Sequence, residues 1–213
     1  MDVLVAGGHG KVALRLLGLL AAQGHRARGL IRDPGQAADL GARGAVAVLG
    51  DLEADTDLAG YVQGADVVVF AAGAGPGSGP ERKRTVDLGG AVKLADAALA
   101  VGVRRYVMVS SIGADRPQAA SGGMRPYLEA KAEADRHLMA SGLDYTIVRP
   151  GSLTDDPGSG RVRVSTDLGH RGAIPRDDVA AVLAAVLDAP NTVGVTFEVF
   201  GGDLPVAEAV RSL

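Results

Sequence analysis

The first twenty residues constrain the fold of this chain more than any other stretch. Residues 3–6 form a short apolar run with β-branched side chains, as expected of a buried parallel strand. Gly7, Gly8 and Gly10 follow directly, and apolar residues then recur at helical spacing over residues 12–20. A strand, a glycine turn and a helix in this order predict a dinucleotide site, because free backbone N–H groups at a helix N-terminus attract a diphosphate. A tight turn without a ligand is the alternative.

The glycine turn has specific predicted tasks. Gly7 lets the chain turn tightly, and Gly10 lets the backbone approach a pyrophosphate. Ala13 is small enough for the helix to pack against the strand. The residues of this turn that we expect to contact the cofactor are Gly7, Gly8, His9, Gly10, Lys11 and Val12.

Composition limits the classes of protein to consider. The chain has 213 residues, of which 47% are hydrophobic, enough for one domain with a full core. A net charge of −3 argues against a nucleic-acid surface. No apolar run reaches membrane length and Met1 leads directly into the first strand, so we expect neither a membrane segment nor a signal peptide. The lack of Cys and the scattered His residues predict no disulfide, no thiol catalysis, no metal site and a cytoplasmic location.

Strands and helices alternate along the rest of the chain. Further strands are predicted at residues 25–31, 45–49, 66–71, 104–110, 144–148 and 195–200, with a candidate short strand at 161–165. Helices are predicted at residues 36–41, 57–63, 84–101, 126–140, 177–188 and 205–213, the last with Pro205 at its first position. This alternation predicts an α/β fold with a doubly wound parallel sheet of about seven strands in the order 3-2-1-4-5-6-7. We expect a single domain over residues 1–213, in which residues 151–213 add a mostly irregular substrate-side segment, the last strand and the last helices.

The carboxyl ends of the strands are where a doubly wound sheet binds its ligand. Arg32 follows the second strand, where NAD enzymes usually have an acidic residue for the ribose 2′-OH. A cation there favours a 2′-phosphate, and therefore NADP over NAD. Asp33 is the next residue and Arg32 alternatively serves as a solvated turn residue, so NAD stays open. Cofactor contacts after the third, fourth and fifth strands are predicted at Asp51, which would accept from the adenine amino group, and at Leu52, Ala71, Ala72, Gly73 and Ser110.

The segment YLEAK places Tyr127 and Lys131 four residues apart, on one face of the helix at 126–140. A nearby ammonium stabilises a phenolate, so the phenol can exchange a proton. A serine hydroxyl from the end of the fifth strand is positioned to polarise the same carbonyl oxygen. Tyr-x-x-x-Lys also occurs in helices by chance, and the alternative is that both side chains only line the cofactor site.

Together these motifs resemble the short-chain dehydrogenase/reductase superfamily. The closer resemblance is to its atypical, small, single-domain NAD(P)-binding members, near the NmrA-like and biliverdin-reductase-B-like groups. It covers essentially the whole chain and rests on AGGHGKVA, IRDP, GDL, FAAG, VDLGGA, VMVSSIGA, YLEAK and YTIVRPG. The resemblance implies a Rossmann fold, a bound NAD(P) and a small-molecule substrate. Members occur as monomers and as homodimers, so both states are open.

The resemblance also implies roles for individual residues. Tyr127 would be the acid/base, and Lys131 would lower its pKa and hold the nicotinamide ribose. Ser111 would hold the substrate oxygen, with Ser110 as the second choice. The cofactor set would be completed by Pro150 and Gly151, which would run past the nicotinamide.

Some positions depart from the family pattern. Asp87 stands where extended members usually have an Asn that supports a proton relay. The chain after the sixth strand is expected to be too short for the substrate domain of a sugar-nucleotide epimerase. The loop at 73–84 is either a lid or a flexible connection, and its basic end, which includes Arg82, would meet an anionic substrate or form a solvated face. Met124 and Arg125 are candidate neighbours of the substrate by position.

These observations predict an NADP(H)-dependent oxidoreductase. It would transfer hydride between the nicotinamide and a small carbonyl, alcohol or quinone-like substrate. The alternative is a non-catalytic NAD(P)-binding sensor or a partner-docking regulator of the NmrA-like kind. The presence of Ser111, Tyr127 and Lys131 together favours the enzyme, because a sensor does not need all three.

Overall fold

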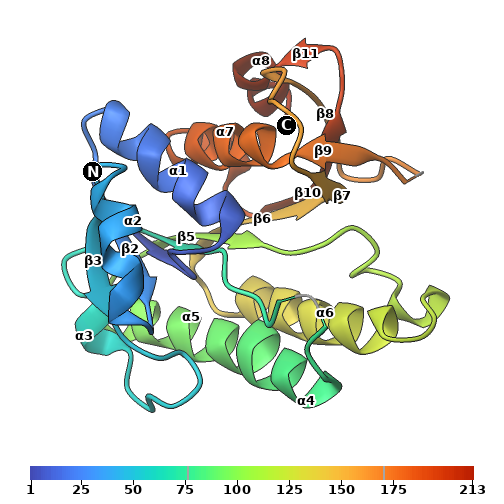
Figure 1. Ribbon diagram of the computed structural model, residues 1–213. Coiled ribbons are helices and arrows are strands. Elements are labelled where there is room, and N and C mark those ends of the chain that lie inside the picture. Colours follow the sequence, from blue (N-terminus) through green and yellow to red (C-terminus); the bar gives the residue numbers. More distant parts are fainter. Residues whose placement is uncertain (76, 170) are drawn as a thin grey trace.

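A computed structural model describes residues 1–75, 77–169 and 171–213 (Figure 1). Pro76 of the loop at 73–84 and His170 therefore lie outside the described residues. Within the described residues one nine-stranded sheet has the order β11-β8-β10-β6-β5-β4-β1-β2-β3. Its strands are β1 (Asp2–Ala6), β2 (Arg26–Ile31), β3 (Val46–Leu49), β4 (Val67–Phe70), β5 (Arg105–Val109), β6 (Asp144–Pro150), β8 (Arg161–Ser165), β10 (Val195–Gly201) and β11 (Leu204–Pro205).

The parallel part of this sheet confirms the predicted fold class. The strands β3, β2, β1, β4, β5, β6 and β10 are parallel and follow one another in the predicted order. The candidate short strand is β8, which pairs antiparallel with β10 and with β11, so the sheet is larger than predicted. Pro205 ends β11, paired with Arg161, and does not begin the last helix.

The segment after β6 contains more regular structure than the sequence predicts. β7 (Ser152–Thr154) and β9 (Ala173–Pro175) form a second, two-stranded parallel sheet within a stretch expected to be mostly loop. Strands of three residues are too short to show a hydrophobic period, so only their pairing across the fold identifies them.

Helices cover both faces of the main sheet (Figure 1). One apolar cluster packs α1 (Lys11–Ala22), α2 (Ala37–Gly41), α7 (Arg176–Leu187) and α8 (Val206–Arg211) on one face. A second cluster packs α3 (Ala59–Val62), α5 (Ala91–Ala100) and α6 (Met124–Ala140) on the other. Among the described residues, three short 3-10 turns connect these elements: η1 (Pro34–Gln36), η3 (Pro117–Ala119) and η4 (Pro190–Thr192).

The helix predicted at 84–101 begins earlier and is not uniform. The short α4 (Pro80–Arg82) leads into a π-helical segment, η2 (Lys83–Gly90), which continues as α5. A π-helical segment has a wider turn than an α-helix, and such segments are frequent at functional sites. The segment η2 contains Asp87, whose side chain is buried.

Candidate cofactor and active site

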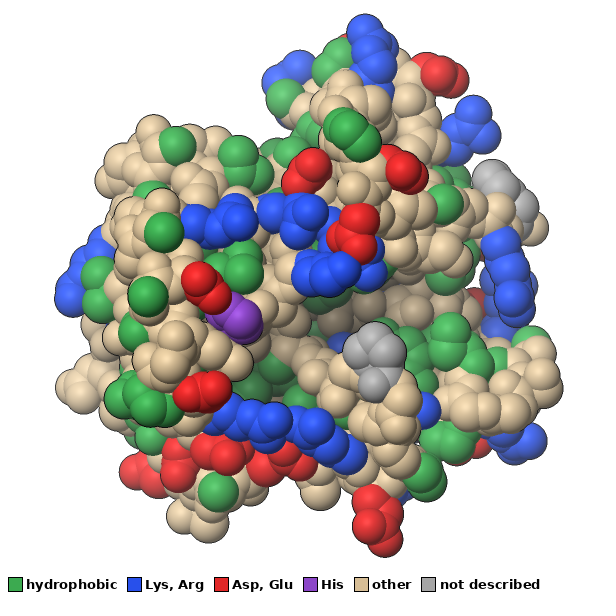
Figure 2. Space-filling model, in the orientation of Figure 1, with side chains coloured by type: hydrophobic (Ala, Val, Ile, Leu, Met, Phe, Trp, Pro, Cys, Tyr) green, Lys and Arg blue, Asp and Glu red, His purple; other side chains and the backbone are tan. Residues whose placement is uncertain are grey.

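Two adjoining cavities lie along the carboxyl ends of the parallel strands. The first, which we call the β2 cavity, has a volume of about 260 Å³ and is lined by the ends of β2, β3 and β4. The second, the β6 cavity, has a volume of about 640 Å³ and reaches the ends of β5 and β6. Both are lined by Gly10 and by residues 71–73, so they form one continuous hollow. Figure 2 shows this face of the molecule, with basic side chains around the hollow.

The glycine turn after β1 has the shape that the sequence predicts. Gly7 has φ +77°, and a Cβ there would lie 2.6 Å from Cα of Ala72, so only glycine fits. The N–H of Gly10 donates to the Gly7 carbonyl at 2.8 Å, which closes the turn. Gly8 is turned away from the cavities: it is buried against β2, and its N–H donates to the Leu30 carbonyl at 2.9 Å.

The N-terminus of α1 opens into the hollow. Gly10 is its N-cap and makes no side-chain capping hydrogen bond, and the first turn has no acidic residue. Lys11 and Val12 of this turn line the β6 cavity. An α-helix has unpaired N–H groups in its first turn and a partial positive charge there. This uncapped terminus over a glycine turn therefore fits the diphosphate of a dinucleotide.

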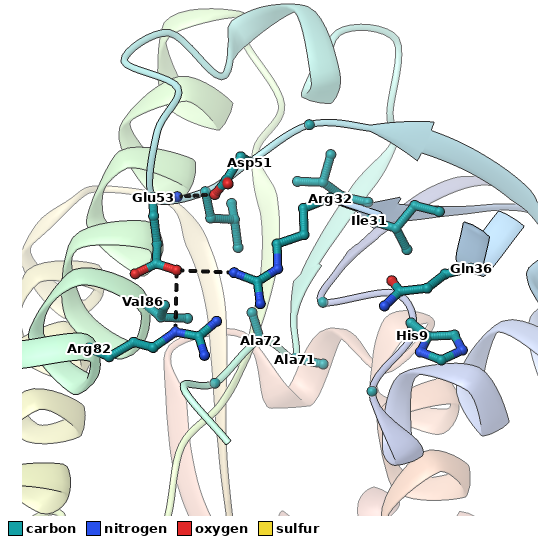
Figure 3. A pocket seen from close by; sticks show the side chains of 16 residues that line it. His9, Ile31, Arg32, Gln36, Asp51, Glu53, Ala71, Ala72, Arg82 and Val86 are labelled. Carbon is teal, nitrogen blue, oxygen red and sulfur yellow. Dashed lines mark hydrogen bonds and ion pairs between the residues drawn. The ribbon is translucent and has the colours of Figure 1, made fainter. Parts of the chain in front are cut away.

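The predicted contacts of the third strand lie in the β2 cavity (Figure 3). Oδ1 of Asp51 accepts the N–H of Glu53 at 2.8 Å, so part of this carboxylate stabilises the turn after β3. Leu52 lies beside it on the cavity wall. His9 lies on the opposite side, where its Nε2 is 2.7 Å from Oδ2 of Asp39 on α2.

Arg32 also lines the β2 cavity, but it has a partner that the sequence did not reveal. Its Nη1 lies 3.4 Å from Oε2 of Glu53, and Nε of Arg82 lies 3.4 Å from the same oxygen. Glu53 comes two residues after Asp51, so its place shortly after the third strand is the signal in the sequence for this position. The sequence does not indicate that Arg82 belongs to this cavity, because Arg82 reaches it from α4, far from β2 and β3 in the chain.

The candidate catalytic residues come together at the β6 cavity. Ser111, Tyr127 and Lys131 all line it, together with Pro150 and Gly151. Nζ of Lys131 lies 5.9 Å from the centre of the Tyr127 ring and donates to the Val109 carbonyl at 3.1 Å. Lys131 is only 3% exposed, so its position is determined by its surroundings.

Asp87 is the counter-ion of Lys131. Its Oδ1 lies 3.3 Å from Nζ of Lys131, and its Oδ2 accepts the N–H of Ala74 at 3.1 Å. Asp87, the residue that departs from the family pattern, thus connects α6, which contains Lys131, with the loop after β4.

The two serines after β5 have different surroundings. The hydroxyl of Ser110, a residue 3% exposed, donates to Oδ2 of Asp135 at 2.9 Å. The same oxygen also accepts from Arg149 at 2.9 Å. Burial raises the pKa of Asp135, against the opposing effects of Arg149 and of the Ser110 hydrogen bond. The hydroxyl of Ser111 donates to the Ile112 carbonyl at 3.2 Å and lines the β6 cavity from a half-buried position.

The rim of the β6 cavity contains further cations. Oδ2 of Asp155 accepts from Lys11 at 2.6 Å, and its Oδ1 accepts from Arg176 at 3.0 Å. Met124 lines this cavity, as its position suggests, whereas Arg125 pairs with Glu129 on the surface of α6.

No group of three or more His, Cys, Asp or Glu side chains is placed to hold a metal ion within residues 1–75, 77–169 and 171–213. In the same part of the chain, every helix is too short or too polar to cross a membrane.

A family model described as NAD(P)H-binding matches residues 7–190. The chain belongs to this family. Its relatives and its structural neighbours agree with the atypical, single-domain branch of the short-chain dehydrogenase/reductase superfamily that the motifs resemble. The expected binding of a pyridine nucleotide is therefore supported at the level of the family.

One relative and two solved structures that are similar to this chain have names of different kinds. The Bacillus subtilis (strain 168) protein "Uncharacterized sugar epimerase YhfK" is 41% identical over 215 residues, covering 100% of both chains. A solved structure from Bacillus halodurans, assigned by name to the NAD-dependent epimerases/dehydratases, is 43% identical, with a TM-score of 0.96 and 100% of both chains covered. ChuY of Escherichia coli O157:H7, named an anaerobilin reductase, is 25% identical, with a TM-score of 0.77 over 96% of this chain and 98% of its own. The names of these similar proteins are thus of oxidoreductase and of epimerase type, and we do not predict the epimerase class from the sequence.

Proposed function

We propose that this protein is an NADP(H)-dependent oxidoreductase that acts on a small carbonyl, alcohol or quinone-like substrate. The observation that carries the proposal is the position of Ser111, Tyr127 and Lys131 around one cavity, which is continuous with the hollow at the glycine turn. The dinucleotide would extend from the β2 cavity, past the N-terminus of α1, into the β6 cavity. The name of ChuY as a reductase supports the same class of reaction.

The cofactor would be held by residues along the whole hollow. Gly7 and Gly10 would admit the diphosphate, with the N–H groups of His9, Lys11 and Val12 near it. Arg32 would bind the 2′-phosphate, which favours NADP over NAD. Further contacts would come from Asp51, Leu52, Ala71, Ala72, Gly73, Lys131, Pro150 and Gly151. Gly8 and Ser110 would support this site through packing and through the Asp135 hydrogen bond.

The bound nicotinamide supplies or accepts the hydride at the substrate carbon. In reduction, Tyr127 donates its proton to the substrate oxygen, and in oxidation it takes that proton back. Ser111 donates a hydrogen bond to the same oxygen and so fixes the substrate against the tyrosine. The ammonium of Lys131 stabilises the phenolate that remains on Tyr127.

A non-catalytic sensor is less consistent with these positions. It would need the β2 cavity and the glycine turn, but not a hydroxyl, a phenol and an ammonium around a second cavity. We also propose that this chain forms a single domain, acts on a small-molecule substrate and is located in the cytoplasm.

The first test measures cofactor binding. NADPH and NADH are titrated into the wild type, Arg32→Glu and the control Arg43→Glu, with fluorescence and calorimetry as readouts. Arg43 is exposed and lies outside both cavities. We expect tighter binding of NADPH to the wild type and to the control, and loss of this preference in Arg32→Glu. A wild-type preference for NADH would refute the role of Arg32, and absence of binding would refute the cofactor site.

The second test measures turnover. A panel of carbonyl and quinone compounds is screened with the wild type, Tyr127→Phe and the control Tyr145→Phe, whose side chain does not line the β6 cavity. We expect NADPH oxidation by the wild type and the control, and a loss of about 100-fold or more in Tyr127→Phe, in line with general acid catalysis. Equal activity of Tyr127→Phe would exclude the tyrosine as the proton donor.

A further inference from the structure

Three charged side chains meet in the β2 cavity: Arg32, Arg82 and Glu53. Arg32 Nη1 and Arg82 Nε each lie 3.4 Å from Oε2 of Glu53. The other oxygen, Oε1, accepts a hydrogen bond from the Thr85 hydroxyl at 2.6 Å. Figure 3 shows the two guanidinium groups approaching one carboxylate from different sides. Glu53 therefore connects the end of β2 with α4 and η2.

The contacts of Glu53 with the two arginines are long and partly exposed to solvent. A charge-assisted N–H···O bond is typically about 2.7–2.9 Å, which is shorter than both of these. The side chains of Arg32, Arg82 and Glu53 are 55%, 41% and 27% exposed. Partly exposed pairs of this kind contribute little energy, so another anion can compete for the arginines.

We propose that Arg82 is a second ligand for the 2′-phosphate of NADP(H), and that Glu53 competes with this phosphate for both arginines. The inference rests on the proposed function, because it takes the β2 cavity as the adenosine site. A phosphate carries more charge than a carboxylate and accepts several hydrogen bonds from guanidinium groups at once. A carboxylate beside it is repelled, so Glu53 weakens the binding of NADP(H).

The orientation of Glu53 supports this competition. Thr85 holds the carboxylate from the side of η2, so Glu53 does not depend on Arg32 for its position. Arg82 uses its Nε toward Glu53, and a guanidinium group has further N–H donors on its other nitrogens. Two cations from separate elements thus border the same part of the cavity as one acidic side chain.

The test separates the 2′-phosphate from the rest of the nucleotide. Adenosine 2′,5′-bisphosphate and 5′-AMP are titrated by calorimetry into the wild type, Arg82→Ala, Arg82→Lys, Glu53→Gln and the control Arg84→Ala. Arg84 is exposed and does not line the β2 cavity. Thermal unfolding of each variant shows that it is folded.

The expected results differ for each variant. Arg82→Ala weakens the bisphosphate roughly tenfold and leaves 5′-AMP unchanged, because only a hydrogen bond to a charged group is lost. Arg82→Lys recovers part of this loss. Glu53→Gln strengthens the bisphosphate by roughly fivefold, the size of one partly exposed charge interaction, and leaves 5′-AMP unchanged. Arg84→Ala changes neither affinity.

Four outcomes would overturn the proposal. Equal weakening of both nucleotides in Arg82→Ala would place Arg82 against the adenine or the ribose. Weaker binding of 5′-AMP to Glu53→Gln would make Glu53 a ribose ligand, which implies preference for NAD(H). If the wild type binds 5′-AMP without any gain from the 2′-phosphate, this inference fails together with the proposed preference for NADP(H), whereas the proposed dinucleotide site stands. If the wild type binds neither nucleotide, the proposed function fails with it.

Discussion

Nζ of Lys131 lies 3.3 Å from Oδ1 of Asp87, and the two side chains are 3% and 1% exposed. A buried charge without its counter-ion is strongly destabilising, because the protein interior cannot replace the lost hydration. Asp87 also accepts the N–H of Ala74, so it stabilises the loop after β4 beside the glycine turn. The pair therefore links the stability of the fold to the geometry of the candidate active site.

Removal of either charge is expected to destabilise the protein. We expect Asp87→Asn and Lys131→Met each to lower the free energy of unfolding by about 3 kcal/mol, the effect of breaking a buried ion pair. The double variant should lose clearly less than the sum, since neither charge is then left alone. Urea unfolding of the four proteins of this cycle measures the coupling. Additive losses, within about 0.5 kcal/mol, would show that the two charges do not interact.

The hydroxyl of Tyr106 gives a second stability prediction. Tyr106 is fully buried in β5, its hydroxyl has no hydrogen-bond partner among the described residues, and burial raises its pKa. Tyr106→Phe should raise the free energy of unfolding by about 1 kcal/mol, because an unsatisfied polar group is removed. Tyr61→Phe is the control and should be destabilising, since that hydroxyl donates to Asp55 at 2.8 Å. Thermal unfolding distinguishes the two, and destabilisation by Tyr106→Phe would reveal a hydrogen bond to water.

Asp155 predicts a pH dependence of stability. The hydrogen bond from Lys11 lowers the pKa of Asp155 below its ordinary value of 3.8. Burial opposes this shift, and the charges of Arg176, Lys11 and Arg15 lower the pKa further. Because the pKa is lower in the folded state than in the unfolded state, the stabilisation is present above 3.8 and is lost as the pH falls through the folded value.

Asp155→Asn should therefore be slightly less stable than the wild type at neutral pH. The difference should shrink in acid and at high salt, because the carboxylate is half exposed and screened by solvent. Denaturant unfolding over a series of pH values measures it. A constant difference at all pH values would mean that the ionisation of Asp155 has no part in stability.

Substitution by alanine is expected to have opposite effects on stability at two glycines of the first βα unit, Gly8 and Gly18. A Cβ on Gly8 would lie 2.8 Å from Cα of Gly29 in β2, so Gly8→Ala should lower the free energy of unfolding by about 1–3 kcal/mol through overpacking. A Cβ on Gly18 in α1 would meet Arg43 at an ordinary 3.8 Å. Gly18→Ala should raise stability by about 0.5–1 kcal/mol, since alanine favours the helix. Equal effects at both positions in thermal unfolding would contradict this assignment.

Much of the candidate site was predictable because it lies at the ends of strands. Arg32, Asp51 and residues 71–73 line the hollow as expected, since parallel strands bring their carboxyl ends to one edge. Glu53 lies farther past β3 than the residues that the sequence indicates. The sequence offers Arg82 as a contact of an anionic substrate, and the structure places it in the β2 cavity instead.

The choice between Ser110 and Ser111 shows what the sequence leaves open. Both follow β5, and the sequence does not indicate which hydroxyl is already engaged. Both serines line the β6 cavity, but packing of α6 against β6 brings Asp135 and Arg149 next to Ser110 and engages its hydroxyl in their network. The proposed function assigns Ser111 to the substrate oxygen and Ser110 to the support of the site.

The order of the parallel strands, the glycine turn and the family can be predicted from the chain, because hydrophobic period, glycines at a strand end and a Tyr-x-x-x-Lys segment are local signals. Which charges meet depends on the folded arrangement. Arg82 lies 29 residues beyond Glu53, and Lys131 follows Asp87 after β5 and a long loop. Ion pairs of this kind depend on how the loop after β4, η2 and α6 pack together, and a pairing over such a separation leaves no periodic pattern in the chain.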